Sequence, residues 1–327
     1  MKSIGRVVLE RLEDVRRKAA LLLGCNNNEL SITRNTTEAM NAVAEGLHLK
    51  AGDRVLTTDQ EHPGGLAGWR YLARHRGVIV DQVALPVPRA DNNRIISRFA
   101  ERMRPKTKVI SISHVTYTTG FRLPVKALAD LAHNHGALLI VDGAQAPGVL
   151  KVDVKSLDCD AYATSGHKWM LGPKGTGLLY IHERVADRIR PLMLQDGPGA
   201  YTASTGTRNL PAIIGLGAAI DLLDAIGAER IESRAMALRA RLLEGLNSIG
   251  RIAIVSPTQH EQSSALATFT LPEAVDHRRF ARTLSDRHRI TTRLVTTPTV
   301  KGIRISTHLY NNEQDIDQLL EAVKALI

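Results

Sequence analysis

A lysine and an aspartate lie 26 residues apart, each in a short polar run that follows an apolar segment. Lys168 belongs to the run SGHKW, and Asp142 opens the run DGAQ. The apolar segment 137–141 predicts a buried strand that ends at Asp142, and residues 160–164 predict a second strand before the lysine run. Ligands of open α/β sheets bind at the carboxyl ends of the parallel strands. We therefore expect Asp142 and Lys168 to face the same crevice.

An amine and a carboxylate in one crevice suit a cofactor with an aldehyde, a basic ring nitrogen and a phosphate, which describes pyridoxal phosphate. The lysine amine condenses with the aldehyde to form a Schiff base. The carboxylate beside the ring nitrogen keeps that nitrogen protonated, so the ring can accept electrons. Taken alone, Lys168 fits a solvated surface lysine and Asp142 fits a helix N-cap. The two runs together favour the cofactor site.

The runs VDGAQ and SGHKW, with their spacing, resemble the class V branch of the pyridoxal phosphate-dependent aminotransferase fold. This branch includes cysteine desulfurases and isopenicillin N epimerase-like enzymes. The resemblance implies that Lys168 forms the Schiff base and that Asp142 contacts the pyridine nitrogen. It also implies that Gln145 hydrogen-bonds the phenolic oxygen of the ring, and that Ser165 and His167 bind the phosphate.

Two further motifs lie after predicted strands. The run NTTEA at 35–39 opens a helix and fits an ordinary N-cap, but the positive end of a helix also binds phosphate. The resemblance points to Thr36 and Thr37 in this first phosphate-binding turn. A single histidine is more often structural than catalytic, yet the pKa of an imidazole suits proton transfer. The family places a stacking histidine after a glutamate, which indicates His62 here.

Two motifs near the second half of the chain match the family as well. The segment STGTRN fits a turn and a helix cap, but in the family its threonine reaches the phosphate of a neighbouring subunit. This implies a homodimer in which Thr207 binds cofactor in trans. An alternating strand would place Arg304 on one face and Ile303 and Ile305 on the other. Most arginines contact solvent, but Arg304 resembles the arginine that binds the substrate carboxylate, for which a guanidinium fork is well shaped.

Two departures from the family pattern bear on the reaction. Desulfurases need a nucleophilic cysteine on the loop before the arginine strand, and residues 287–298 contain none, because Cys25 and Cys159 lie elsewhere. Typical desulfurase activity is therefore disfavoured, whereas a C–S lyase needs no such cysteine. Tyr117 replaces the asparagine of the desulfurase branch, which leaves Gln145 as the expected contact to the phenolic oxygen.

The expected function is a pyridoxal phosphate-dependent enzyme of the class V aminotransferase type. It would act at the α-carbon of an amino acid through the Lys168 Schiff base, by transamination or epimerisation, with His62 and Asp142 as further catalytic residues. The alternatives are a C–S lyase or desulfurase-like activity and a truncated, non-catalytic protein of the same fold. The last alternative follows from the expectation that the chain lacks the several dozen residues that precede the first helix in family members.

The predicted elements give an α/β protein of fold type I. Apolar runs alternate with helical patterns from about residue 30, which predicts a mainly parallel sheet covered by helices. Strands are expected at 30–33, 54–58, 78–85, 108–113, 137–142, 160–164 and 175–181, with helices near 36–46, 65–76, 93–104 and 124–135. A helical region over 211–249, strands near 251–255, 264–270, 289–294 and 302–306, a helix over 276–286 and a last helix from Glu313 follow. We expect a large domain over 1–225, opened by a helix over 1–24, and a small C-terminal domain over 226–327.

The composition of the chain limits the kinds of partner that we expect. The net charge of +10 is spread along the 327 residues without a basic run interleaved with aromatic residues, so we expect no nucleic-acid partner. No apolar run approaches the ~20 residues of a membrane span. The two cysteines form no disulfide framework, which favours a cytoplasmic location. We expect no metal site.

Overall fold

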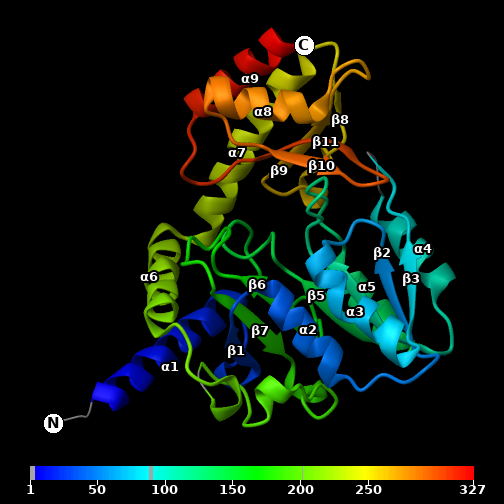
Figure 1. Cartoon of the computed structure of the whole chain (residues 1–327), viewed down its shortest axis with the longest axis vertical. Coiled ribbons are helices and arrows are strands. Elements are labelled where there is room, and N and C mark those ends of the chain that lie inside the picture. Colours follow the sequence, from blue (N-terminus) through cyan, green and yellow to red (C-terminus); the bar gives the residue numbers. More distant parts are fainter. Residues whose placement is uncertain (1–3, 88–90, 201) are drawn as a thin grey trace.

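A seven-stranded sheet forms the body of the protein in this computed structural model, which describes residues 4–87, 91–200 and 202–327. Its strands are β1 (Leu30–Thr33), β2 (Arg54–Thr58), β3 (Ile79–Val83), β4 (Thr107–Ser113), β5 (Leu138–Asp142), β6 (Ala161–Ser165) and β7 (Gly177–Ile181). They are ordered β1-β7-β6-β5-β4-β2-β3 (Figure 1). The pairs from β3 to β6 are parallel, and β7 runs antiparallel to both β6 and β1. The predicted mainly parallel sheet is confirmed.

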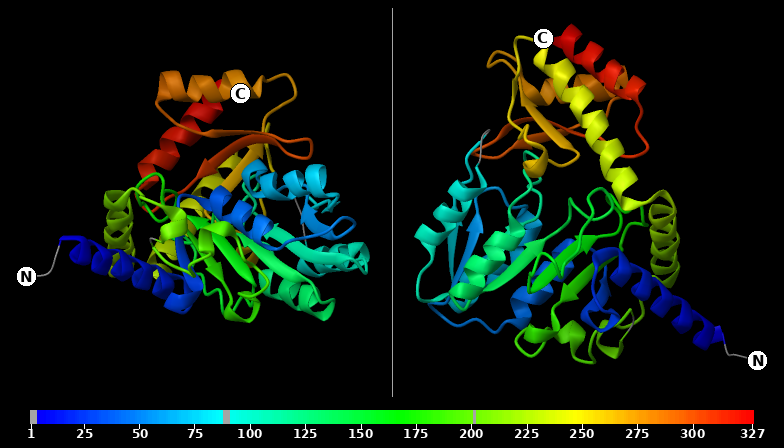
Figure 2. Two further views of the ribbon diagram at one scale, coloured as in Figure 1. Left: turned by 60° about the horizontal axis from the view of Figure 1, so that its bottom comes forward. Right: turned by 180° about the vertical axis from the view of Figure 1, so that it is seen from behind.

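Helices cover both faces of this sheet. They are α1 (Ile4–Leu23), α2 (Thr36–Gly46), α3 (Pro63–Arg76), α4 (Asn92–Arg102), α5 (Val125–Asn134) and α6 (Leu210–Ile226). Along β5, Leu138 and Ile140 pack with α2 and α3, whereas Leu139 and Val141 pack with the helices of the other face. The view from behind shows α4 and α5 on the face away from α2 and α3 (Figure 2). Burial on both faces explains why the central strands are continuous apolar runs.

A second, smaller sheet with three helices lies beyond the carboxyl ends of the central strands (Figure 1). It consists of β8 (Ala253–Ile254), β9 (Leu266–Thr270), β10 (Arg293–Thr296), β11 (Lys301–Ser306), α7 (Ala228–Asn247), α8 (His277–His288) and α9 (Glu313–Leu326). The strand order is β10-β11-β9-β8, and all pairs are antiparallel. Ala267, Phe269 and Ile303 form a core with the three helices on one face. The opposite face is therefore the one that can contribute to a site.

The helical region expected over 211–249 is broken in two. α6 and α7 meet at an angle of 80° at Gly227, whose φ is +92°. The first turns of α7 place Ile231 and Ala235 in the core of the large sheet, and its later turns pack with the small sheet. One helix thus links the two sheets. The division of the chain at residue 225 stays a prediction.

The strand whose start differs most from the sequence prediction is β10. The strand expected over 289–294 is β10, which begins at Arg293, because α8 continues to His288 and Arg289 then adopts a left-handed conformation with φ +57°. The start of β10 at Arg293 places this residue directly opposite Arg304 of β11. Short 3₁₀ helices complete the described elements: η1 (Asn27–Glu29), η2 (Glu183–Val185), η3 (Leu192–Leu194), η4 (Ala203–Thr205) and η5 (His260–Gln262).

None of the helices in the described ranges is long and apolar enough to cross a membrane by itself, although α6 and α7 pass that test together as a bent pair. The described residues also contain no group of three or more His, Cys, Asp or Glu side chains that could hold a metal ion. The N-terminal helix, expected over 1–24, spans Ile4–Leu23, and residues 1–3 lie outside the described part.

Candidate active site

Three neighbouring parallel strands deliver polar side chains to one edge of the large sheet. β4 ends at Ser113 and β5 at Asp142, which are directly paired, and β6 ends at Ser165. Lys168 follows three residues later, in the loop between β6 and β7. Because parallel strands share one carboxyl edge, residues distant in sequence meet there.

The N-terminus of α2 lies against this edge. Asn35 caps the helix by accepting a hydrogen bond from the Glu38 N–H at 2.9 Å. The Thr36 N–H donates to the Ser165 hydroxyl at 3.0 Å, and the hydroxyls of the two residues are 2.7 Å apart. The structure thus brings Thr36 and Ser165 together at a positive helix end, which is a place where a phosphate is stabilised.

The N-terminus of α3 brings His62 and Asp142 to the same place. His62 caps α3 by accepting a hydrogen bond from the Gly64 N–H at 3.1 Å, and its ring remains exposed. An added Cβ at Gly65 would lie 2.7 Å from the Asp142 Oδ2, and one at Gly64 would lie 2.3 Å from the Thr37 Oγ1. The two glycines therefore let these side chains approach the helix closely.

The half-buried Lys168 and the buried Asp142 are charges that influence each other. Burial lowers the pKa of Lys168, while attraction to Asp142 opposes that shift and the nearby Arg304 adds to it. Burial raises the pKa of Asp142, and the Ala144 N–H, which donates to Oδ1 at 3.0 Å, opposes it together with Lys168. Partial burial and the positive charge of Lys168 lower the pKa of His62. The three predicted catalytic residues thus form one electrostatic group.

Gln145 is held in a fixed orientation by Trp169. The indole Nε1–H donates to the Gln145 Oε1 at 2.8 Å. An indole N–H can only donate, so the amide oxygen must face it. The amide Nε2 of Gln145 is left as a donor, which is what the phenolic oxygen of the expected cofactor needs.

Arg304 reaches the site from the small sheet. Its Nη1 donates to the Tyr117 carbonyl oxygen at 2.5 Å, and the Tyr117 ring stands edge-on to His62 with centroids 5.2 Å apart. Burial, with repulsion from Arg293, lowers the pKa of Arg304 to about 10. Its buried Nε has no partner among the described residues. An anion is the group that would satisfy this nitrogen.

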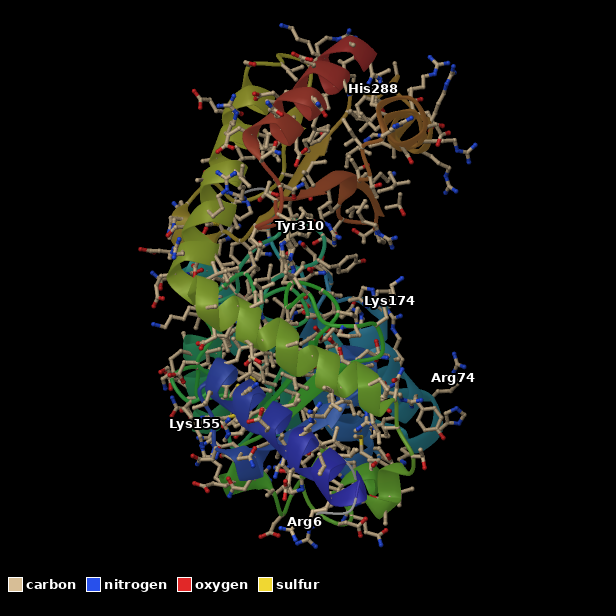
Figure 3. The ribbon with its side chains drawn as sticks, turned by 90° about the vertical axis from the view of Figure 1, so that its left-hand side faces the viewer. Arg6, Arg74, Lys155, Lys174, His288 and Tyr310 are labelled. Atoms are coloured by element: carbon tan, nitrogen blue, oxygen red, sulfur yellow. The ribbon has the colours of Figure 1, made fainter. Side chains whose placement is uncertain are left out.

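Several contacts around the site were not predicted. The buried Glu61 accepts hydrogen bonds from Thr58 at 2.6 Å and Ser113 at 2.5 Å, and burial raises its pKa to about 7. The His308 ring stacks on Trp169, with centroids 5.0 Å apart, and on Tyr310 at 4.3 Å. Tyr310 lies where the two parts of the molecule meet (Figure 3). The contacts of Glu61 with Ser113 and of His308 with Trp169 join residues far apart in the chain, and the sequence carries no local signal for them.

Thr207 is the predicted site residue that the structure does not bring to this group. It is exposed and lines a surface hollow with Arg34, Glu38 and Arg208. No hydrogen bond joins it to another described residue. A contact with cofactor in trans, as the resemblance implies, stays a prediction.

Pyridoxal phosphate fits the polar atoms that the fold leaves without a partner. Within the described chain, the Lys168 amine and the Asp142 Oδ2 form no hydrogen bond, and the buried Nδ1 of His167 has none either. An aldehyde suits the amine, a ring N–H suits the carboxylate, and a phosphate suits the α2 N-terminus beside Ser165. A buried carboxylate oxygen without a donor is costly, so a positively charged ring nitrogen beside Oδ2 would stabilise Asp142.

Comparisons with known proteins identify the family of the chain. The family model described as aminotransferase class-V matches residues 1–319. The chain is 33% identical to isopenicillin N epimerase of Amycolatopsis lactamdurans, covering 100% of this chain and 87% of that protein. It is 30% identical to a probable cysteine desulfurase of Halalkalibacterium halodurans, covering 98% and 84%.

A solved structure is similar over almost the whole chain. It is a cystine C–S lyase in complex with its reaction product cysteine persulfide, with a TM-score of 0.90 and 28% identity over 99% of this chain and 89% of that one. The match includes both sheets, since it spans nearly all described residues. Sequence family, fold and site geometry lead to one conclusion: the chain belongs to the class V aminotransferase family of pyridoxal phosphate-dependent enzymes.

Proposed function

We propose that this protein acts at the α-carbon of an amino acid through a Schiff base on Lys168, by transamination or epimerisation. One observation carries the proposal: the half-buried Lys168 amine, which forms no hydrogen bond with the described chain, and the buried Asp142, whose Oδ2 forms none, share an electrostatic site at the carboxyl edge of neighbouring strands. Two such charges are costly in a protein interior unless a ligand uses them.

The roles follow from the contacts. When bound, the cofactor supplies a protonated ring that accepts electrons from the α-carbon. Lys168, whose pKa is lowered by burial, takes or returns the proton at that carbon. Asp142 keeps the ring nitrogen protonated, and Gln145, fixed by Trp169, donates its amide N–H to the phenolic oxygen. Arg304 binds the α-carboxylate with the N–H groups that Tyr117 leaves free.

His62 and the phosphate contacts complete the proposed site. The exposed His62 ring, fixed as the cap of α3, stacks on the cofactor ring. Thr36, Thr37, Ser165 and His167 bind the phosphate at the α2 N-terminus. We also propose a homodimer in which Thr207 reaches the phosphate of the neighbouring subunit, supported by its exposure at the rim of the hollow described above.

The test is spectroscopic. Purified protein with added pyridoxal phosphate is expected to show a visible absorption band that borohydride abolishes, because the reagent reduces the bond between Lys168 and the cofactor. Lys168→Ala should lack this band. The matched control is Lys174→Ala, which removes an exposed lysine of the same loop (Figure 3) and should keep it. A borohydride-sensitive band that persists in Lys168→Ala would refute the lysine assignment.

The products distinguish transamination from epimerisation. In D₂O, a panel of amino acids is expected to include one that gains deuterium at the α-carbon, which reports proton removal by the site. A keto acid formed without release of ammonia then indicates transamination, and the opposite enantiomer indicates epimerisation. A protein that shows the band but exchanges no α-proton would support the non-catalytic alternative.

A second candidate is a C–S lyase. It is favoured by the similarity to the cystine C–S lyase structure and needs no nucleophilic cysteine. Burial raises the pKa of Cys25 to about 12 and raises that of Cys159 as well, so neither is an activated thiol. Release of a persulfide from cystine would identify this activity.

A further inference from the structure

A row of side chains crosses the small sheet on the face that looks toward the site. Arg304 of β11 is paired with Arg293 of β10 on one side and with Thr268 of β9 on the other. Paired residues of antiparallel strands point to the same face. The neighbouring positions, Ile303 and Phe269, pack into the helical core on the opposite face. The row Arg293–Arg304–Thr268 is therefore turned away from that core.

Two members of the row fix its position against the large sheet. Thr268 donates to the Thr118 carbonyl oxygen at 2.7 Å, and Arg304 donates to that of Tyr117 at 2.5 Å. Two neighbouring members of the row, Thr268 and Arg304, thus bind two neighbouring residues of one loop, Thr118 and Tyr117. Arg293 is the next member, and its charge acts on Tyr117, His62 and Arg304. Arg293, which is exposed and directly opposite Arg304, therefore lies at the solvent edge of the site.

The two arginines are not neutralised by the protein. Neither forms an ion pair with an acidic residue of the described chain, and the Arg293 side chain forms no hydrogen bond there. Like charges directly opposite on two strands are destabilising. Repulsion from Arg293 adds to burial in lowering the pKa of Arg304. The site thus holds one more cation than a single α-carboxylate needs.

We propose that the substrate is an amino acid with a second anionic group on its side chain, and that Arg293 binds this group while Arg304 binds the α-carboxylate. The inference rests on the proposed function, in which Arg304 is the carboxylate ligand. Directly opposite residues have Cβ atoms about 5 Å apart. Two arginine side chains that start from positions this close suit two carboxylates joined by a short chain, as in a dicarboxylic amino acid.

Binding of an amine-free probe tests this proposal without turnover. Glutarate has two carboxylates, and glutaramate has the same length with one carboxylate replaced by a neutral amide. By calorimetry on the protein loaded with pyridoxal phosphate, glutarate should bind about tenfold more tightly than glutaramate, as expected for one charged hydrogen-bonded pair. Arg293→Gln should abolish this preference.

The matched control is Arg287→Gln. Arg287 is an exposed arginine of α8, beside His288 at the far end of the small part (Figure 3), so the substitution removes the same charge away from the site. It should keep the preference for glutarate. Equal binding of the two probes by the wild type, or an unchanged preference in Arg293→Gln, would overturn the proposal.

The two proposals fail in different ways. A protein that shows the borohydride-sensitive band but binds glutarate and glutaramate equally keeps the proposed function and loses the second anion site. A protein without the band loses the proposed function itself. If Arg293→Gln weakens both probes by the same factor, the two arginines share one carboxylate, and the side-chain subsite is refuted.

Discussion

At the residue scale, the site depends on how closely the α3 N-terminus approaches Asp142. The Asp142 carboxylate is buried with one oxygen on the Ala144 N–H, and the other oxygen lies beside Gly65. His62 is the N-cap of the same helix, directly before its first residue, Pro63. Any side chain at Gly65 must therefore displace either the carboxylate or the helix that positions the histidine.

Gly65→Ala should weaken cofactor binding more than it weakens the fold. The new Cβ would lie 2.7 Å from the Asp142 Oδ2, closer than a real contact allows. In a helix, alanine is favoured over glycine by roughly 1 kcal/mol, which offsets part of the strain. We expect at least a tenfold loss of affinity, equivalent to about 1.4 kcal/mol, in an absorbance titration with pyridoxal phosphate.

Gly250→Ala serves as the control for this experiment, because an added Cβ there meets nothing within 4 Å. It should bind cofactor like the wild type. Unchanged affinity in Gly65→Ala would mean that the carboxylate position tolerates the methyl group, and that this close approach has no role in cofactor binding.

At the element scale, the break between α6 and α7 connects the two sheets. α7 leaves Gly227 at 80° to α6 and contributes side chains first to the large core and then to the small one. The backbone at Gly227 has φ +92° and ψ 132°, a region that only glycine adopts readily. The direction of α7, and with it the position of the small sheet, therefore depends on this residue.

Gly227→Ala is expected to lower the free energy of unfolding by about 1–3 kcal/mol, the usual cost of forcing a side chain into such a conformation. Urea denaturation of the purified protein measures this. Gly5→Ala is the control, since Gly5 lies in the helical turns of α1 and an added Cβ meets nothing within 4 Å. Its effect should be neutral or slightly stabilising. A stability loss in the control but not at Gly227 would contradict the strained bend.

At the scale of the whole molecule, the site is built where the two sheets meet. The large sheet supplies Lys168 and Asp142, and the small sheet supplies Arg304 through its contact with Tyr117. The stack of Trp169 on His308 joins the lysine loop to the end of β11. Thr207 lies apart from this group, so a second copy of the chain is the proposed way for it to contribute.

Mixed dimers test that arrangement. Thr207→Ala should lower cofactor affinity by about three- to tenfold, the cost of one phosphate hydrogen bond. Lys168→Ala should form no covalent band. A mixed dimer of the two variants, isolated with two different tags, contains one site with an intact Lys168 and an intact Thr207 from the other subunit. At limiting cofactor it should show more band than the Thr207→Ala homodimer.

A mixed dimer that binds no better than Thr207→Ala alone would show that Thr207 acts within its own chain or not at all. A protein that sediments as a single chain of 35.7 kDa would contradict the dimer directly.

Much of the fold was predictable because its signals are local. The apolar run before Asp142 predicts a strand that is buried on both faces of the sheet. A cap residue such as Asn35, together with the residues just after it, marks the start of a helix. The start of β10 was wrong because Arg289 continues the turn after α8, and nothing in its residue type demands a left-handed conformation. The register of β10 with β11, and hence the position of Arg293 opposite Arg304, could not be predicted for the same reason.

The sequence by itself determined the cofactor chemistry, since an amine, a carboxylate and small polar residues after buried strands have few other uses in common. It also determined the mainly parallel sheet, through apolar runs of strand length. Only the tertiary structure decided what surrounds the lysine: the close approach at Gly65, the Glu61 network, the His308 stack and the unpaired charge of Arg293. These contacts join residues that are far apart along the chain. Their geometry depends on strand order and packing, which residue types and spacing do not encode locally.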